Sequence, residues 1–425
     1  MVKGTSRNAI VLGEQSLLVQ CGELLSKHGF DLAAVVSKNR IVADWCAERE
    51  INVLSSYQGL KEQFEEGQVD YVFSITNLQV LPGWLIALGK QAINFHDGPL
   101  PKYAGLNAPV WALLNDESEH GVTWHEMTEK VDEGRILAQQ KFPIVPGETA
   151  LSINAKCYQA ATDTFASLVE NLTAGTLSPL QQDLSERSYY GLTKRPDGAG
   201  LIDWSQSVES IERLVRALDH GSYANPLTSP KISIDGKPIA ILEAKIFTRE
   251  SQNTAGEIVG LSANHLRIAC GGGVLEVTKV AELSGHFYSC LEQFSREYGL
   301  SVGSTLESAG AEQVRSMLSR RVTDVCRYED AWVSDLLNAE AVTIPYDSPS
   351  DALSADTLWE ERAFPLPASV LSDSRYQQHS KAFVLALASL LFARLNSKTE
   401  YAFAAVANEP QEINAFFEAY LPLPV

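Results

Sequence analysis

The nine residues INFHDGPLP, Ile93 to Pro101, decide how the first part of this sequence folds. Apolar residues lead directly into an asparagine, a histidine and an aspartate, and two prolines follow. The apolar start predicts a buried strand over 92–95. Asn94 and His96 stand two positions apart, so this strand would direct both side chains to one side at its carboxyl end. Because open α/β sheets bind ligands at the carboxyl ends of their strands, the segment predicts a functional site.

The sequence on either side of this segment has the pattern of an open α/β sheet. Short apolar runs alternate with stretches in which apolar residues recur at helical spacing, which predicts parallel strands joined by crossover helices in a Rossmann-like arrangement. The predicted strands are 9–12, 32–36, 71–75 and 92–95. No GxGxxG follows the first of them, so we predict no nicotinamide site.

The rest of the sequence divides into further segments. A long helix is predicted over 150–172, and the Pro, Gly and Asp residues of 193–200 predict a linker. Short alternating strands then predict a small, mostly β domain, and the last residues look like part of a longer polypeptide. The predicted boundaries are 1–185 for the α/β domain, 200–285 for the β domain, 286–355 for a helical linker and 356–425 for a last segment.

A second unusual segment runs from His120 to Leu137, HGVTWHEMTEKVDEGRIL. Its first part alternates like a strand, and Asp132 falls in a tight loop before another strand. This loop would bring the Asp132 carboxylate back toward His96. Asn94 and His96 offer donors that hold an oxyanion as a carbonyl carbon becomes tetrahedral. Because no Ser or Cys sits in a nucleophile elbow, the set predicts acyl transfer without a covalent intermediate.

Each of these residues also has a structural interpretation. An Asn or His at a strand end is more often structural than catalytic. Asp132 alone is also typical of a turn, because Asp and Gly are common turn residues. His120 and His125 together with His96 resemble metal ligands, but they alternate along a strand and lack a closed ligand set, so no metal is predicted. The ordered spacing of Asn94, His96 and Asp132 favours the catalytic interpretation.

Charge and composition exclude several classes of partner. The 425 residues carry a formal net charge of −19 and no long basic run, so no nucleic-acid partner is predicted. The six cysteines are scattered without a CxxC pair, and the first residues lack the apolar core of a secretion signal, which predicts a reduced, cytoplasmic protein. The most apolar window, 382–395, is too short to span a membrane, so no membrane partner is predicted.

The two segments together resemble the folate-dependent formyltransferases, a family that includes methionyl-tRNA, glycinamide ribonucleotide and amino-sugar formyltransferases. The signature of that family is Asn-x-His, then a loop with proline, then a distant Asp-x-Gly. The matching positions here are Asn94, His96, Pro101, Gly105, Asp132 and Gly134. Residues 200–285 are similar to the small carboxy-terminal β-barrel domain, OB-like in fold, of the tRNA and amino-sugar members.

The resemblance implies transfer of a formyl group from 10-formyltetrahydrofolate to an amine. Asn94 and His96 would hydrogen-bond the formyl oxygen as it gains charge. Asp132 would keep His96 in its useful protonation state and relay the proton that the amine loses. The resemblance also implies that the pterin lies against two segments of the catalytic domain, with the binding residues Val80, Leu81, Leu85, Met127, Thr128 and Val131.

Within the family, residues 94–137 look most like the formylation domains that open some nonribosomal peptide synthetases. The tRNA enzymes usually carry Arg directly before the loop glycine and Ser two positions after the signature His. In this sequence the corresponding residues are Ala104 and Gly98. Residues 356–425 resemble the second lobe of a mixed α/β condensation domain, without its HHxxxDG motif, so we predict a truncated, inactive remnant. The implied partners are an aminoacyl carrier protein with a phosphopantetheine arm, whose α-amine accepts the formyl group, and an adjacent adenylation domain of the same synthetase.

Two other functions share parts of this pattern. An amino-sugar nucleotide or methionyl-tRNA formyltransferase would use the same three catalytic residues. A non-catalytic docking module would keep the fold but need none of them, whereas Asn94, His96 and Asp132 are all present.

Overall fold

The computed structural model of the protein describes residues 7–223, 225–306, 311–329, 331, 333–334, 368–372, 402–406 and 420–424. The chain forms two compact units, Met1–Asp324 and Val325–Val425. Of the second unit, the described secondary structure includes η4 (Cys326–Tyr328), α11 (Ala368–Leu371) and the antiparallel pair β16 (Ala402–Val406) and β17 (Tyr420–Pro424). The condensation-like fold predicted for 356–425 therefore falls largely outside the described residues.

The first unit begins with a sheet of seven strands in the order β3-β2-β1-β4-β5-β7-β8. The strands are β1 (Arg7–Leu12), β2 (Phe30–Val36), β3 (Val53–Leu54), β4 (Val69–Ser74), β5 (Gly89–His96), β7 (Glu119–Glu126) and β8 (Ile136–Pro143). Strands β1 to β5 are parallel to one another, which confirms the Rossmann-like α/β class. The sheet ends in an antiparallel edge, because β7 runs against both β5 and β8.

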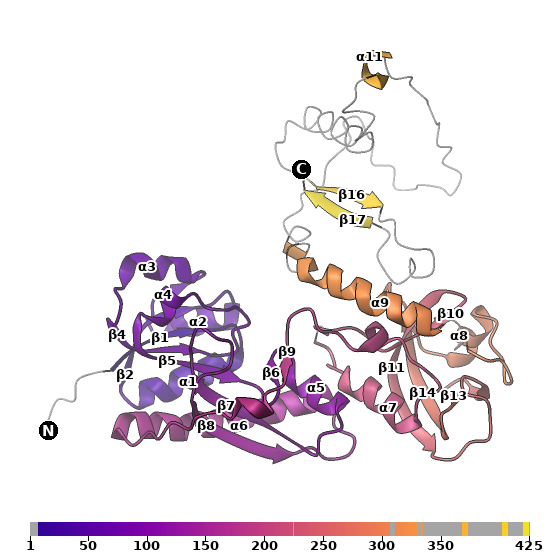
Figure 1. Ribbon diagram of the computed structural model, residues 1–425, viewed down its shortest axis with the longest axis horizontal. Coiled ribbons are helices and arrows are strands. Elements are labelled where there is room, and N and C mark those ends of the chain that lie inside the picture. Colours follow the sequence, from indigo (N-terminus) through magenta and orange to yellow (C-terminus); the bar gives the residue numbers. More distant parts are fainter. Residues whose placement is uncertain are drawn as a thin grey trace. The chain divides into compact units, whose positions relative to one another are not determined.

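Alternation along each strand divides the apolar residues between two layers of helices. Ala9 and Val11 belong to one core, and Ile10 and Leu12 belong to the other. The first core is covered by α1 (Ser16–Lys27), α2 (Arg40–Glu48), α5 (Ala108–Leu114) and α6 (Ala150–Ala174). The second is covered by α3 (Leu60–Gln63), which follows η1 (Tyr57–Gly59), and by α4 (Gly83–Ile86). Figure 1 shows α3 and α4 on one side of the strands and α1 and α6 on the other.

The long helix predicted over 150–172 is α6, and its ends have identifiable causes. Thr149 is the N-cap residue, and its hydroxyl accepts a hydrogen bond from the backbone N–H of Ser152. The Ser152 side chain in turn accepts from the backbone N–H of Thr149. The helix ends at Gly175, whose φ of 69° is in the left-handed region that favours glycine.

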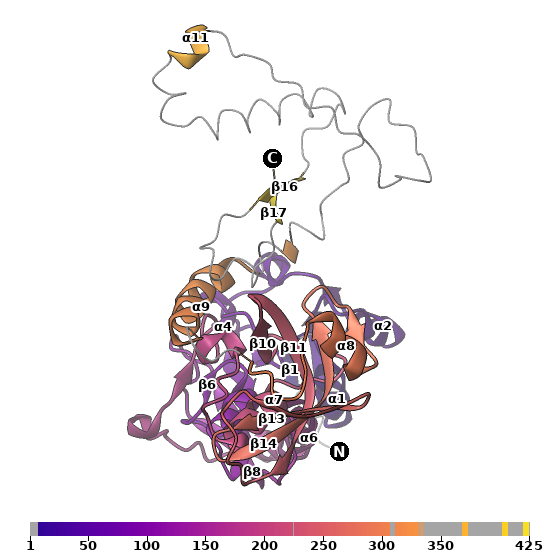
Figure 2. The same ribbon diagram turned by 90° about the vertical axis from the view of Figure 1, so that its right-hand side faces the viewer.

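A second, antiparallel sheet follows in the same unit, with α7 (Val208–Ala217) packed against it (Figures 1 and 2). Its hydrogen-bonded order is β10-β11-β14-β13-β12, and β15 pairs with β14. This order ends at β10 and β12, so closure into the expected OB-like barrel stays a prediction, as do the domain boundaries. The strands are β10 (Lys231–Ile234), β11 (Lys237–Thr248), β12 (Ile258–Ser262), β13 (His265–Cys270), β14 (Gly273–Glu282) and β15 (Phe287–Tyr288).

Short elements connect and extend the two sheets. Ala217, Leu218 and Leu227 pack in the core of the first sheet, so the two sheets are joined by apolar contacts as well as by the chain. Helices α8 and α9 lie in the stretch predicted to be a helical linker. The connecting elements are β6 (Ala104–Gly105), η2 (Leu184–Glu186), β9 (Tyr189–Tyr190), η3 (Asp197–Gly200), α8 (Leu291–Glu297) and α9 (Ala311–Val325).

Lys231 at the start of β10 is buried, and no described carboxylate pairs with it. Its ammonium group donates to the carbonyl oxygen of Ala199 and, at 2.7 Å, to the hydroxyl of Thr228. Burial lowers the pKa of Lys231 to about 8. The charged form is therefore penalised in the folded protein, and this penalty is fully present below that pH.

We expect Lys231→Met to raise the free energy of unfolding by about 1–3 kcal/mol near pH 7, because it removes an unpaired buried charge. The Thr228 hydroxyl already donates to the Ala199 carbonyl at 2.9 Å, so that acceptor keeps a partner. The gain should shrink as the pH rises from about 8 to about 10, because the folded wild-type lysine then loses its proton. Urea unfolding at both pH values measures this, and an equal gain at both, or a loss at neutral pH, would contradict the explanation.

Candidate active site

Strand β5 brings Asn94 and His96 to the same face of the sheet at its carboxyl end. The antiparallel strand β7 places His125 directly opposite Asn94. The side-chain nitrogen of Asn94 lies 3.1 Å from Nε2 of His125. His125 Nδ1 lies 2.8 Å from the carbonyl oxygen of Glu126 and donates to it, since a carbonyl only accepts.

The loop between β7 and β8 brings Asp132 against these side chains. Its Oδ2 lies 3.8 Å from Nδ1 of His96, and its Oδ1 lies 3.4 Å from Nε2 of His125. Oδ2 also accepts a hydrogen bond of 2.8 Å from the backbone N–H of Gly105. Asp132 is only 9% exposed. The three residues singled out in the sequence therefore meet in one buried cluster, whose catalytic role stays a prediction.

The loop after β5 holds His96 from its other side. His96 Nε2 lies 2.8 Å from the carbonyl oxygen of Tyr103, so Nε2 carries a proton and donates it to this bond. Nδ1 is then the nitrogen that faces Asp132. A Cβ at Gly98 would lie 2.7 Å from His96 Nε2, so a glycine at this position leaves room for the ring.

The charge of Asp132 is the main electrostatic feature of the cluster. Burial alone would raise the pKa of Asp132, but attraction to His96 and hydrogen bonds from His125 and the Gly105 N–H outweigh it. The pKa of Asp132 is held well below its ordinary value, so this carboxylate is ionised at neutral pH. It faces His96 Nδ1, and an N–H at that position and the Asn94 amide are two donors suited to an oxygen that gains charge.

The main chain at Asp132 is fixed by a side chain from a distant segment. Asp132 has a φ of 58°, in the left-handed region. The amide nitrogen of Gln182 donates to the carbonyl oxygens of Asp132 and Gly134, at 2.8 and 2.6 Å. A Cβ at Gly134 would lie 1.8 Å from the carbonyl oxygen of Glu126, so only glycine allows this loop to pass so close to β7.

Sequence reasoning missed His125 and Gln182 as parts of this site. His125 was considered only as a metal ligand, although its place opposite Asn94 follows once β5 and β7 are paired antiparallel. Gln182 lies in an irregular segment between η2 and the end of α6, where no periodicity indicates its neighbours. Gln182 is only 6% exposed, and a buried amide needs polar partners, but this burial is a property of the fold and not of the sequence pattern.

The six residues expected to contact a pterin lie on two segments, and their role stays a prediction. Val80 and Val131 are 75% and 38% exposed. Leu81 and Leu85 are buried in the core beneath α4, so the Leu85 side chain is not at the surface. Met127 is half-buried and Thr128 is exposed, both after the end of β7.

The described residues contain no group of three or more His, Cys, Asp or Glu side chains arranged to hold a metal ion. His120 lies apart from Asp132, with Nε2 2.8 Å from the carbonyl oxygen of Asp97. Burial lowers the pKa of His120 to about 4, so it is neutral at physiological pH. In the described part of the chain, every helix is too short or too polar to cross a bilayer.

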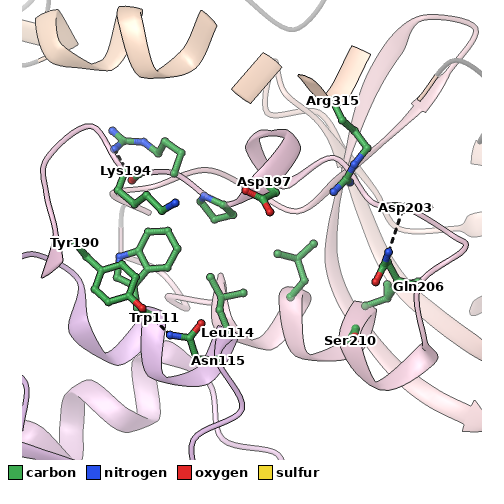
Figure 3. A pocket seen from close by; sticks show the side chains of 14 residues that line it. Trp111, Leu114, Asn115, Tyr190, Lys194, Asp197, Asp203, Gln206, Ser210 and Arg315 are labelled. Atoms are coloured by element: carbon green, nitrogen blue, oxygen red, sulfur yellow. Dashed lines mark hydrogen bonds between the residues drawn. The ribbon is translucent and has the colours of Figure 1, made fainter. Parts of the chain in front are cut away.

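A cleft of about 480 Å³ opens between α5, the segment after β9 and α7 (Figure 3). The rings of Trp111 and Tyr190 stack in its wall with centroids 4.7 Å apart, and Tyr190 also stacks 5.6 Å from Tyr103. Tyr190 pairs with Gly105 through the short strands β9 and β6. The backbone N–H of Gly105, which binds the Asp132 carboxylate, therefore belongs to a residue paired with the wall of the cleft.

Comparison with known families identifies the chain. A model described as "Formyl transferase" matches residues 26–169, and a model described as "Formyl transferase, C-terminal domain" matches residues 197–294. Together the two matches span more than half of the sequence, in the order in which the two sheets occur. The protein belongs to the formyltransferase family and is a formyltransferase.

Solved structures share this fold at low sequence identity. An N-formyltransferase from Helicobacter canadensis, in complex with folinic acid and dTDP-3-aminofucose, is 21% identical with a TM-score of 0.52, covering 64% of this chain and 99% of that one. The sugar 3N-formyltransferase WlaRD, in the presence of dTDP and 5-N-formyl-THF, is 20% identical with a TM-score of 0.50, over 65% and 98%. HypX from Aquifex aeolicus with tetrahydrofolic acid is 20% identical with a TM-score of 0.49, over 70% and 48%.

We expect Gln182→Leu to lower kcat for formyl transfer by about 10- to 100-fold, because the loop would no longer hold Asp132 against His96. KM for the formyl donor should change little. Gln181→Leu is the matched control, since its neighbour Gln181 is exposed. Steady-state kinetics with thermal unfolding of each variant measures the effect. An unchanged kcat in Gln182→Leu, or the same loss in the control, would show that this amide does not position the carboxylate.

Proposed function

We propose that this formyltransferase takes its formyl group from 10-formyltetrahydrofolate and passes it to a primary amine. The cluster of Asn94, His96 and Asp132 is the observation that carries the proposal, because it joins two hydrogen-bond donors to an ionised carboxylate in one buried site. The donor is supported by the H. canadensis enzyme and WlaRD, which share the fold and were crystallised with folinic acid and 5-N-formyl-THF.

The residues of the cluster have separate tasks in this reaction. The donor supplies a formyl carbon that an amine can attack. His96 Nδ1–H and the Asn94 amide donate to the formyl oxygen as it gains negative charge, which stabilises the tetrahedral arrangement. Asp132 holds the proton on His96 by its charge, and it relays the proton that the attacking nitrogen loses toward the departing N10 nitrogen.

The acceptor that we favour is the α-amine of an aminoacyl group on a carrier protein's phosphopantetheine arm. Support comes from the sequence of residues 94–137, which looks most like synthetase formylation domains, and from the condensation-like sequence of residues 356–425. The net charge of −19 disfavours tRNA, whose affinity would depend on phosphate contacts. An adjacent adenylation domain and a cytoplasmic location belong to the same proposal.

An amino-sugar nucleotide is the second candidate acceptor. The H. canadensis structure contains dTDP-3-aminofucose, and WlaRD was crystallised with dTDP. The stacked rings of Trp111 and Tyr190 in the cleft offer an aromatic surface against which a base can pack. The two acceptors differ in size and attachment, so direct assay separates them.

We expect mass spectrometry to show one added formyl group on an aminoacyl-carrier protein that is incubated with the enzyme and 10-formyltetrahydrofolate. His96→Ala should lower the rate by at least about 10²-fold, because a donor to the developing oxyanion is lost. His286→Ala, at an exposed histidine in the turn between β14 and β15, is the matched control and should keep full activity. Formylation of an amino-sugar nucleotide but of no carrier would overturn the acceptor and keep the donor. Formylation of neither would overturn the proposed function.

A further inference from the structure

The aspartate that directly follows His96 has no task in the mechanism above. Its Oδ1 lies 3.9 Å from Nδ1 of His96, and Asp132 Oδ2 lies 3.8 Å from the same nitrogen. Two carboxylates thus flank one ring nitrogen. The Asp97 side chain is 32% exposed, whereas that of Asp132 is 9% exposed. Asp97 is therefore the carboxylate that a group arriving from solvent reaches more easily.

Among the described neighbours of Asp97, His96 and the backbone N–H of Asp97 itself are the groups that stabilise its charge. On α6, the Cys157 thiol lies 3.9 Å from the Asp97 carbonyl oxygen, and burial and the charge of Asp97 raise the pKa of Tyr158 to about 12. On β7, His120 donates to the same carbonyl rather than to the carboxylate. No described lysine or arginine pairs with Asp97. The titratable groups that face it are His96, Asp132, His120, Cys157 and Tyr158.

The pKa values of the two carboxyl groups are shifted in opposite directions. Burial raises the pKa of Asp97, attraction to His96 opposes this, and repulsion from Asp132 adds to it, with a net increase. The pKa of Asp132 is lowered. Environments that push the pKa values of two carboxyl groups apart in this way are typical of sites where the two groups have different acid–base tasks.

We propose that Asp97 binds the acceptor in its ammonium form and takes up its first proton, while Asp132 serves His96. This inference rests on the proposed function, and it holds for either acceptor. A free α-amine has a pKa of about 8, so it arrives mostly protonated at neutral pH and has no lone pair with which to attack. Asp97 accepts the extra proton of the ammonium group at the place where the nitrogen attacks the formyl carbon.

The proton balance of this step closes within the site. The N–H bond of the ammonium group breaks, its electron pair stays on nitrogen, and the proton moves to a carboxylate oxygen of Asp97. The neutral amine then forms a bond to the formyl carbon, and the bond between that carbon and N10 breaks. The second proton of the amine goes to N10, and Asp97 returns its proton to solvent after the product leaves.

Asp97→Asn keeps the shape of the side chain and removes the proton acceptor. We expect kcat/KM for the acceptor to fall by about 10²-fold near pH 7. Near pH 9 it should recover to within about 3-fold of the wild type, because the acceptor then arrives unprotonated. Calorimetric affinity for 5-formyltetrahydrofolate should stay unchanged. Asp163→Asn, at an exposed aspartate on α6, is the matched control and should follow the wild-type pH profile.

An equal loss at both pH values, or no loss at either, would overturn the role of Asp97. Asp97→Ser serves as a second variant, since it also lacks a carboxylate, and it must give the same pH-dependent loss even if Asp97→Asn folds poorly. Wild-type enzyme that formylates no amine at any pH would instead overturn the proposed function, so the two failures are distinguishable.

Discussion

An ionised carboxylate in a buried cluster is the interaction on which the whole site depends. Asp132 remains charged because two imidazoles and one backbone N–H compensate its burial. Its charge acts on the His96 ring at Nδ1, since Nε2 of that ring is already committed to the Tyr103 carbonyl. In the proposed mechanism, loss of this charge would remove one of the two donors to the formyl oxygen and leave the Asn94 amide alone.

The fold supplies this cluster by changing the direction of its strands. The parallel strands through β5 end where polar side chains gather, as open α/β sheets require. The next strand in the sheet, β7, runs the opposite way and therefore places His125 across from Asn94. Its following loop returns Asp132 to the same edge, and Gln182 fixes the backbone there. The geometry of the cluster is thus a product of the sheet's antiparallel edge together with one distant amide.

Much of this arrangement can be predicted from local sequence pattern. The helix predicted over 150–172 begins at the same residue as α6, directly after the N-cap residue Thr149, which forms a capping box with Ser152. Strand alternation likewise predicts that Asn94 and His96 lie on one face. The contacts of Gln182 and the pairing of His125 cannot be found this way, because they join segments that no period relates. Asp97 was visible in the sequence as a polar residue beside His96, but its proximity to the same ring nitrogen as Asp132 depends on the turn after β5.

The most direct test of the central claim is a carboxyl ¹³C NMR titration of Asp132, with its signal assigned by comparison with Asp132→Asn. The account predicts that this signal stays that of a carboxylate as the pH is lowered through about 3.9, the value at which an unperturbed aspartate is half protonated. Protonation of Asp132 at or above that value would contradict the account, because His96 would then lack the charge that holds its proton.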